Sequence, residues 1–219
     1  MLKMDSHIHS EYSPDSQSKI DDILDVARSR NIDIIAISDH NTVDGTSEVM
    51  AKTRNTDILA IPSIEISSSL GHILGFGCEE NIPRDLSPQE TIDRIHDLGG
   101  LAIVPHPYCF YRHGLLHKTD YKDLKIDAIE IRNARFIVGY CNNKAKKLSE
   151  KENLPALGAS DAHYWKFVGD CYSMIDCEKD IDSVLKAIKK NKIEAHGKGT
   201  SNILLSKYLF EKNVLKKFD

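Results

Sequence analysis

The chain has 219 residues, with 29 basic and 33 acidic residues and a formal net charge of -4. The length fits one large domain with a substantial core, and the interspersed charges argue against stable binding of duplex nucleic acid. No apolar stretch approaches the ~18 residues that a membrane-spanning helix needs. The five cysteines are scattered and contain no CxxC pair, which favours reduced thiols. We therefore expect a cytoplasmic protein with no membrane partner, and the sequence leaves its oligomeric state open.

Short apolar runs alternate with amphipathic segments along the chain. Apolar residues at three- and four-residue spacing predict surface helices, and Ser87-Pro88-Gln89-Glu90 is typical of a capped helix start. The predicted helices cover residues 20–30, 88–98, 138–152 and 181–190, and the apolar runs cover 34–37, 59–64, 73–76, 101–104, 128–131 and 156–159.

This alternation predicts a largely parallel sheet that is covered on both faces. Polar motifs follow most of the apolar runs, so they would gather at the carboxyl edge of the sheet. We expect a single domain over residues 1–219, with its motifs between residues 5 and 165. Residues 166–219 would supply closing strands and a C-terminal amphipathic helix, whose apolar positions lie between Ile203 and Leu215.

Histidines and carboxylates recur in these motifs. A strand would place His7 and His9 on one face, so both could bind one ion, and Asp161 and His163 repeat this spacing. Glu65 lies in an apolar run, where a buried carboxylate normally has a cation or becomes protonated. Each histidine taken singly is more often structural, but together the motifs indicate a multinuclear metal site. The candidate ligands are His7, His9, Asp15, His40, Glu65, His72, His106, Asp161 and His163.

The order of these motifs resembles the PHP family of metal-dependent phosphoesterases, named for polymerase and histidinol phosphatase. The resemblance implies an α/β fold of PHP type, a distorted (β/α)7 TIM-like barrel. The matching segments are His7-Ile8-His9 with Asp15 six positions later, Ser38-Asp39-His40, Pro62-Ser63-Ile64-Glu65-Ile66, Gly71-His72-Ile73-Leu74-Gly75, Pro105-His106-Pro107 and Ser160-Asp161-Ala162-His163.

The resemblance also implies a cluster of two to three divalent ions. With oxygen and nitrogen ligands and no cysteine among them, Mn, Fe and Zn all remain open. Some family members have His where Asp15 stands, and the region around His72 varies, so losing either ligand would leave fewer than three ions. The implied ligands are His7, His9, Glu65 and Asp161 for the first ion, Glu65, His72 and His106 for the second, and Asp15, His40 and His163 for the third.

The expected function is hydrolysis of a phosphate ester on a small molecule by metal-activated hydroxide. Histidinol phosphate, a nucleotide and an oligonucleotide end are all compatible substrates. The aromatic residues after Pro107 would either stack on a base or anchor their loop. A metal-dependent amidohydrolase and a non-catalytic, polymerase-associated PHP module are the alternatives. The candidate catalytic acids are Asp15, His40 and His163, the candidate phosphate-binding residues are Arg132, Asn133 and Arg135, and the aromatic residues are Tyr108, Phe110 and Tyr111.

Overall fold

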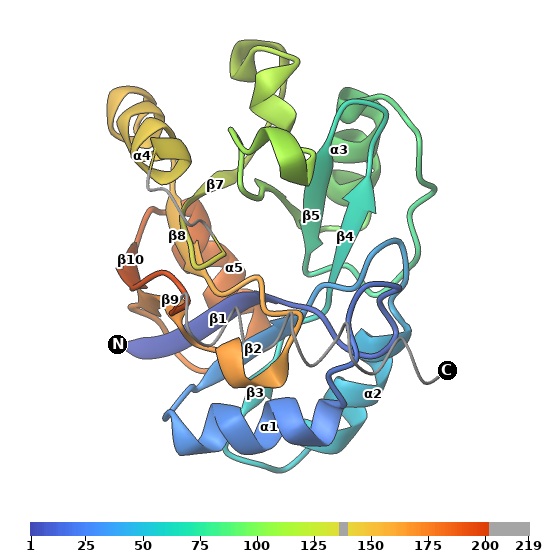
Figure 1. Cartoon of the computed structure of the whole chain (residues 1–219), viewed down its shortest axis with the longest axis vertical. Coiled ribbons are helices and arrows are strands. Elements are labelled where there is room, and N and C mark those ends of the chain that lie inside the picture. The colour runs from blue at the N-terminus through green and yellow to red at the C-terminus, as the bar shows by residue number, and fades with distance from the viewer. Residues whose placement is uncertain (136–139, 202–219) are drawn as a thin grey trace.

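The computed structural model describes residues 1–135 and 140–201, which form two five-stranded sheets with helices outside them (Figure 1). The first sheet contains, in spatial order, β10 (Ile193–Gly197), β9 (Cys171–Ile175), β1 (Leu2–Ile8), β2 (Ile34–Ile37) and β3 (Leu59–Ala60). The second contains β4 (Ser63–Ser67), β5 (His72–Phe76), β6 (Leu101–Val104), β7 (Ala128–Asn133) and β8 (Ala156–Ala159).

Backbone hydrogen bonds join the two sheets at two places, which we call the seams. At the first seam, just beyond the end of β8, the N–H of Asp161 donates to the His7 carbonyl over 2.8 Å. At the second seam, the N–H of Glu65 donates to the Asp39 carbonyl over 3.1 Å, and the N–H of Asn41 donates to the Glu65 carbonyl over 3.0 Å. The sheets thus form the distorted TIM-like barrel that the family resemblance implies.

The barrel is less parallel than the strand–helix alternation predicts. Strands β1, β2 and β3 are parallel, as are β6, β7 and β8, but β5 is antiparallel to β4 and β6. Residues 68–71 connect β4 to β5, and a parallel crossover needs a dozen or more residues. The reversal places His72, at the start of β5, at the edge where β4 and β6 end.

The predicted helices are present as α1 (Ile20–Ser29), α3 (Pro88–Asp97), α4 (Tyr140–Glu152) and α5 (Ile181–Lys189), although residues 138–139 of the third lie outside the described part. Ser87 caps α3, and its hydroxyl accepts from the N–H of Glu90. Short 3-10 turns cover Phe110–Arg112 (η1), Leu115–His117 (η2), Tyr121–Asp123 (η3) and Trp165–Phe167 (η4).

One helix, α2 (Asp44–Thr53), is absent from the sequence predictions. Its buried face is Gly45, Thr46, Val49 and Thr53, so the apolar stripe that marks an amphipathic helix is missing. Gly45 is required by packing, because a Cβ there would lie 2.6 Å from the Ser10 hydroxyl. The helix is therefore specified by a close approach to the barrel and not by hydrophobic periodicity.

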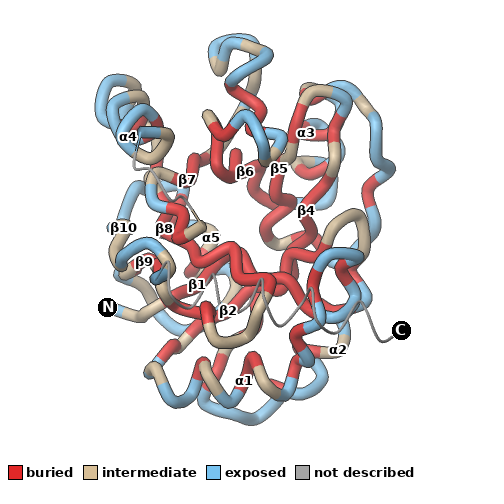
Figure 2. The backbone as a smooth tube through the Cα atoms, in the orientation of Figure 1, coloured by how far each residue is buried: buried red, intermediate tan, exposed pale blue. Residues whose placement is uncertain are grey.

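Buried residues follow the strands, and exposed residues follow the outer helices (Figure 2). Apolar side chains from both sheets, including Met4, Leu74, Phe76 and Leu157, form one core cluster. The predicted C-terminal helix, from Ile203 onward, lies outside the described residues. Within the described ranges, the model contains no helix of the length and apolarity that crossing a membrane requires.

Candidate metal centre

Five imidazole nitrogens surround the Glu65 carboxylate, whose side chain is 1% exposed. They come from the ends of β1 and β2, the start of β5 and the end of β6, so strands far apart in the sequence bring them to one point. The distances to the nearer carboxylate oxygen are 3.3 Å from His7 Nε2, 3.2 Å from His9 Nε2, 3.2 Å from His40 Nδ1, 2.9 Å from His72 Nδ1 and 3.1 Å from His106 Nε2.

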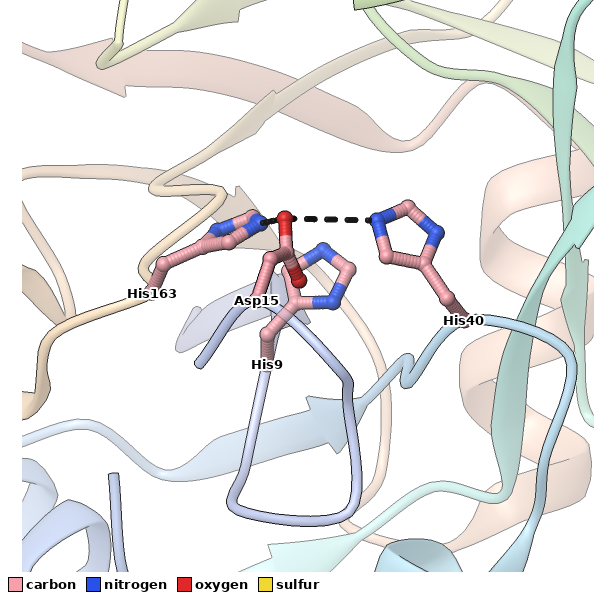
Figure 3. A group of neighbouring side chains, drawn as sticks. All are labelled: His9, Asp15, His40 and His163. Atoms are coloured by element: carbon pink, nitrogen blue, oxygen red, sulfur yellow. Dashed lines mark ion pairs between the residues drawn. The ribbon is translucent and has the colours of Figure 1, made fainter. Parts of the chain in front are cut away.

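A second group lies beside this carboxylate (Figure 3). Asp15 Oδ2 lies 2.7 Å from His163 Nε2 and 3.7 Å from His40 Nε2. The His9 ring lies 4.0 Å from the His163 ring and 4.7 Å from the His40 ring, centroid to centroid. The four side chains each offer one ligand atom within 4.8 Å of the others.

The donor atoms fit divalent ions. Among the described residues, the Nδ1 atoms of His40, His72 and His106 are buried without a hydrogen-bond partner. For His40 and His72 this Nδ1 is the nitrogen nearest Glu65, so the two approach the carboxylate closely without hydrogen-bond geometry. Such convergence suits a shared cation, and imidazole and carboxylate ligands suit Mn²⁺, Fe²⁺ or Zn²⁺. The groups that could hold an ion are His7, His9 and Glu65; His40, Glu65 and His72; and His9, Asp15, His40 and His163.

Neighbouring groups in the cluster have opposite protonation tendencies. Burial acts to lower the pKa of His7, but the charges of Asp161, Glu130 and Glu65 outweigh it and raise that pKa well above its usual value. Burial lowers the pKa of His9 well below its usual value, and repulsion from His163 adds to the effect. His7 therefore tends to hold a proton, whereas its neighbour His9 tends to be neutral.

Asp161 also lies near His7 and His9, with Oδ1 at 3.8 Å and 3.6 Å from their Nε2 atoms. Its backbone has a φ of 53°, a left-handed conformation that is uncommon for a residue with a Cβ. Arg112 approaches both carboxylate oxygens, with Nη1–Oδ2 at 2.6 Å and Nη2–Oδ1 at 2.9 Å. Burial acts to raise the pKa of Asp161, but Arg112, His7 and other cations hold it well below its usual range.

All nine candidate ligands therefore lie in one cluster. The three phosphate-binding candidates differ in whether they reach it. Arg135 joins the cluster, with Nη1 2.7 Å from His163 Nδ1. Asn133 donates through Nδ2 to Glu130 and Asp161, over 3.0 and 2.9 Å, which suits a positioning role. Arg132 does not reach the cluster, since it is exposed and its Nη1 donates to the Gly197 carbonyl over 2.7 Å.

Glu130 is a fully buried residue that the sequence analysis does not single out. Its Oε1 lies 2.8 Å from His7 Nδ1, and its Oε2 accepts from the N–H of His106 over 3.0 Å. It thus orients the His7 imidazole from behind, as carboxylates commonly do for metal-binding histidines, and it also fixes the backbone of His106. The sequence does mark Glu130, because this carboxylate interrupts the apolar run Ala128-Ile129-Glu130-Ile131 in the same way as Glu65 interrupts its own run.

Replacing Glu130 with glutamine is expected to weaken Mn²⁺ binding about 10- to 100-fold, the usual cost of losing such a partner. A binding isotherm on the full chain measures this change. Glu194→Gln, on the exposed edge strand β10, is the matched control and should leave the isotherm unchanged. Equal affinities for Glu130→Gln and the wild type would contradict the role given to Glu130.

A pocket of about 650 Å³ opens over the cluster. Two residues that the motifs do not include, Arg112 and His113, contribute to its wall, and no spacing pattern in the sequence marks them. Tyr111 also lines the pocket and is 67% exposed, whereas Tyr108 lies beneath the ammonium of Lys144, which is 4.0 Å from its ring centroid. The lining residues are Pro14, Asp15, His40, Asn41, Ser67, His72, Arg84, Tyr111, Arg112, His113 and Arg135.

The fold and the cluster define a barrel protein with a group of side chains able to bind metal ions at the carboxyl edge of its strands. Two family models match the chain, the PHP domain over residues 5–124 and a PHP-associated model over residues 139–193. The chain therefore belongs to the PHP family, as its motifs predict.

Two uncharacterised proteins of Methanocaldococcus jannaschii are similar to the chain. One is 37% identical over 161 residues, which cover 69% of this chain and 93% of the relative. The other is 29% identical over 214 residues, which cover 93% of this chain and 85% of the relative.

Solved structures share the fold. A two-domain protein of Bacteroides vulgatus, described as containing a predicted PHP-like metal-dependent phosphoesterase, aligns with a TM-score of 0.75 and 18% identity over 90% of this chain. This chain spans 65% of that protein. An amidohydrolase of Chromobacterium violaceum with bound sulfate aligns with a TM-score of 0.65 and 16% identity, covering 87% of this chain and 97% of its own.

Proposed function

We propose that this protein is a metal-dependent phosphoesterase that hydrolyses a small phosphorylated substrate. The observation that carries the proposal is the buried Glu65 carboxylate, which five imidazoles surround beneath an open pocket. Divalent ions held there would lower the pKa of a water molecule and neutralise phosphoryl oxygens, so no serine or cysteine nucleophile is needed.

The chain supplies the cations that a phosphate ester would meet. Arg112 and Arg135 line the pocket, and both lie near Asp161 on the same side of the cluster. A guanidinium binds phosphate oxygens through directed N–H groups, which fixes the orientation of the ester as well as its charge. In this proposal Asn133 positions Asp161 and does not touch the substrate.

The proton for the leaving oxygen would come from the group formed by Asp15, His40 and His163. Burial is the largest influence on His163 and, with repulsion from Arg135, lowers its pKa to about 4. Burial also acts to lower the pKa of His40, but Glu65 and Asp15 outweigh it and raise that pKa above its usual value. When no ion is bound, His40 therefore holds a proton more readily than His163 does, and His40 lines the pocket.

Candidate substrates are a nucleotide, an oligonucleotide end and histidinol phosphate. The exposed ring of Tyr111 at the pocket favours a substrate with a flat base, since stacking contributes about 1–3 kcal/mol per base. A panel of these compounds, a generic phosphodiester and an amide or lactone, assayed with Mn²⁺ and with a chelator, tests the proposal. We expect metal-dependent phosphate release, and turnover confined to the amide or lactone would instead establish the amidohydrolase alternative.

Metal affinity is expected to rise with pH through neutrality. His7 and His40 must lose a proton to bind an ion, and the pKa of each is raised above the usual value of about 6.5 by the carboxylates named above. Below those pKa values each ion displaces protons, so affinity should change about tenfold per pH unit for every proton released. Mn²⁺ isotherms between about pH 6 and 8 at constant ionic strength measure the slope, and a flat profile would contradict the raised pKa values.

A further inference from the structure

Two cysteines lie next to the site but outside the set of metal ligands. Cys109 is fully buried in the turn after His106, and its N–H donates to the His106 carbonyl over 3.0 Å. Cys141 is partly exposed in the first turn of α4, and its thiol donates to the Tyr108 carbonyl over 3.3 Å. Since Tyr108 directly precedes Cys109, this contact brings the sulfur of Cys141 beside the backbone of Cys109. The turn and α4 lie at the same end of the barrel (Figure 1).

The two thiols also interact with one another. Burial raises the pKa of Cys141, and a hydrogen bond with the Cys109 thiol and the charge of Lys144 act in the opposite direction. Burial likewise raises the pKa of Cys109, and the charge of Arg112 opposes it. Burial is the larger influence, so the pKa of each thiol lies above its usual value, and the case for a reaction between the two thiols rests on their proximity.

We propose that Cys109 and Cys141 are a redox-active dithiol that a small-molecule disulfide, such as oxidised glutathione, converts to an intramolecular disulfide. The more exposed Cys141 thiolate attacks one sulfur of the small disulfide, forming a mixed disulfide and releasing one small thiol. The Cys109 thiolate then attacks the sulfur of Cys141 and expels the second small thiol. Two protein thiols are oxidised, one small disulfide is reduced, and the two protons pass to the released thiols.

This disulfide would constrain the turn that forms part of the pocket wall. Cys109 begins the turn that carries Tyr111 and Arg112, and Arg112 holds Asp161. A bond to Cys141 would attach that turn covalently to α4. The inference does not depend on the proposed hydrolysis, because its test measures the state of the thiols and not turnover.

The test uses the reduced full chain, incubated with oxidised glutathione, quenched by alkylation and analysed by thiol counting and non-reducing peptide mapping. The wild type has five cysteines and should fall from five free thiols to three, with one peptide that links residues 109 and 141. Cys109→Ser should retain glutathione on Cys141, because the resolving thiol is absent. Cys177→Ser, which removes another partly exposed thiol, is the control and should still form the link.

Circular dichroism establishes that each variant is folded. Cys141→Ser is a second variant and is expected to keep all four of its thiols, because it lacks the thiol that attacks first. A wild-type chain that stays at five thiols, that accumulates glutathione on Cys141 without forming the link, or that links other cysteines would overturn the proposal. Recovery of five thiols after treatment with dithiothreitol would support it.

Discussion

Replacement of Glu65 by glutamine is expected to remove metal binding from the cluster and to lower the rate of the proposed hydrolysis by about 10³-fold. The carboxylate lies within 3.3 Å of five imidazole nitrogens, so its charge is shared among all of them. Loss of metal stabilisation of the transition state removes several kcal/mol, and each ~1.4 kcal/mol is a factor of ten in rate. Elemental analysis after loading and dialysis measures retained metal, and single-substrate kinetics measure the rate.

Glu48→Gln is the matched control for this experiment. Glu48 accepts the Tyr12 hydroxyl over 2.7 Å on the surface of α2 and has no contact with the cluster. We expect its metal content and rate to equal those of the wild type. Full metal occupancy in Glu65→Gln would show that Glu65 is not the shared ligand.

Asp161→Asn is expected to lower the free energy of unfolding of the chelator-treated protein by about 3–5 kcal/mol, the typical effect of leaving a buried charge without its partner. Arg112 is 13% exposed, and both oxygens that it approaches belong to Asp161. The neutral amide would leave the guanidinium without a counter-charge. Urea unfolding followed by circular dichroism, with a chelator present, measures the difference.

The pH dependence of this difference has a definite sign. The pKa of Asp161 is held well below its usual range in the folded protein, so its ionised form stabilises the fold above the unfolded-state pKa of about 4. That stabilisation is lost as the pH falls through the folded-state pKa, so wild type and variant should converge in acid.

Asp170→Asn is the control for Asp161→Asn, because it makes the same change in a more exposed ion pair. Asp170 Oδ1 lies 2.8 Å from Arg30 Nη1, and the Arg30 side chain is 35% exposed. Arg30 also donates to two backbone carbonyls, so it keeps partners in the variant. We expect a loss of about 1 kcal/mol or less, and an equal loss in both variants would contradict the account of Asp161.

Site residues whose role follows from their position within a single strand were predictable from the sequence. His7 and His9 share a strand face, and a carboxylate in an apolar strand, such as Glu65, needs a cation. Local chemistry also predicts the start of α3, because Ser87 and Glu90 satisfy each other's backbone N–H groups.

Other parts of the site depend on contacts between distant segments. Arg112 pairs with Asp161, 49 positions away, and neither residue's neighbours in the sequence indicate the other. The antiparallel entry of β5 follows from the short loop before His72, which apolar periodicity cannot reveal. The buried face of α2 consists of small side chains with Val49 as its one apolar core residue, so a search for hydrophobic spacing passes over it.

The two seams of the barrel are formed by residues of the cluster itself, since Asp161 and His7 meet at one and Glu65 at the other. An ion shared by Glu65 and the histidines at the end of β1 would consequently hold one sheet to the other at the places where the barrel could open. Metal binding would then make opening of the whole fold less frequent. The backbone amides at both seams should show the largest decrease in hydrogen exchange with solvent.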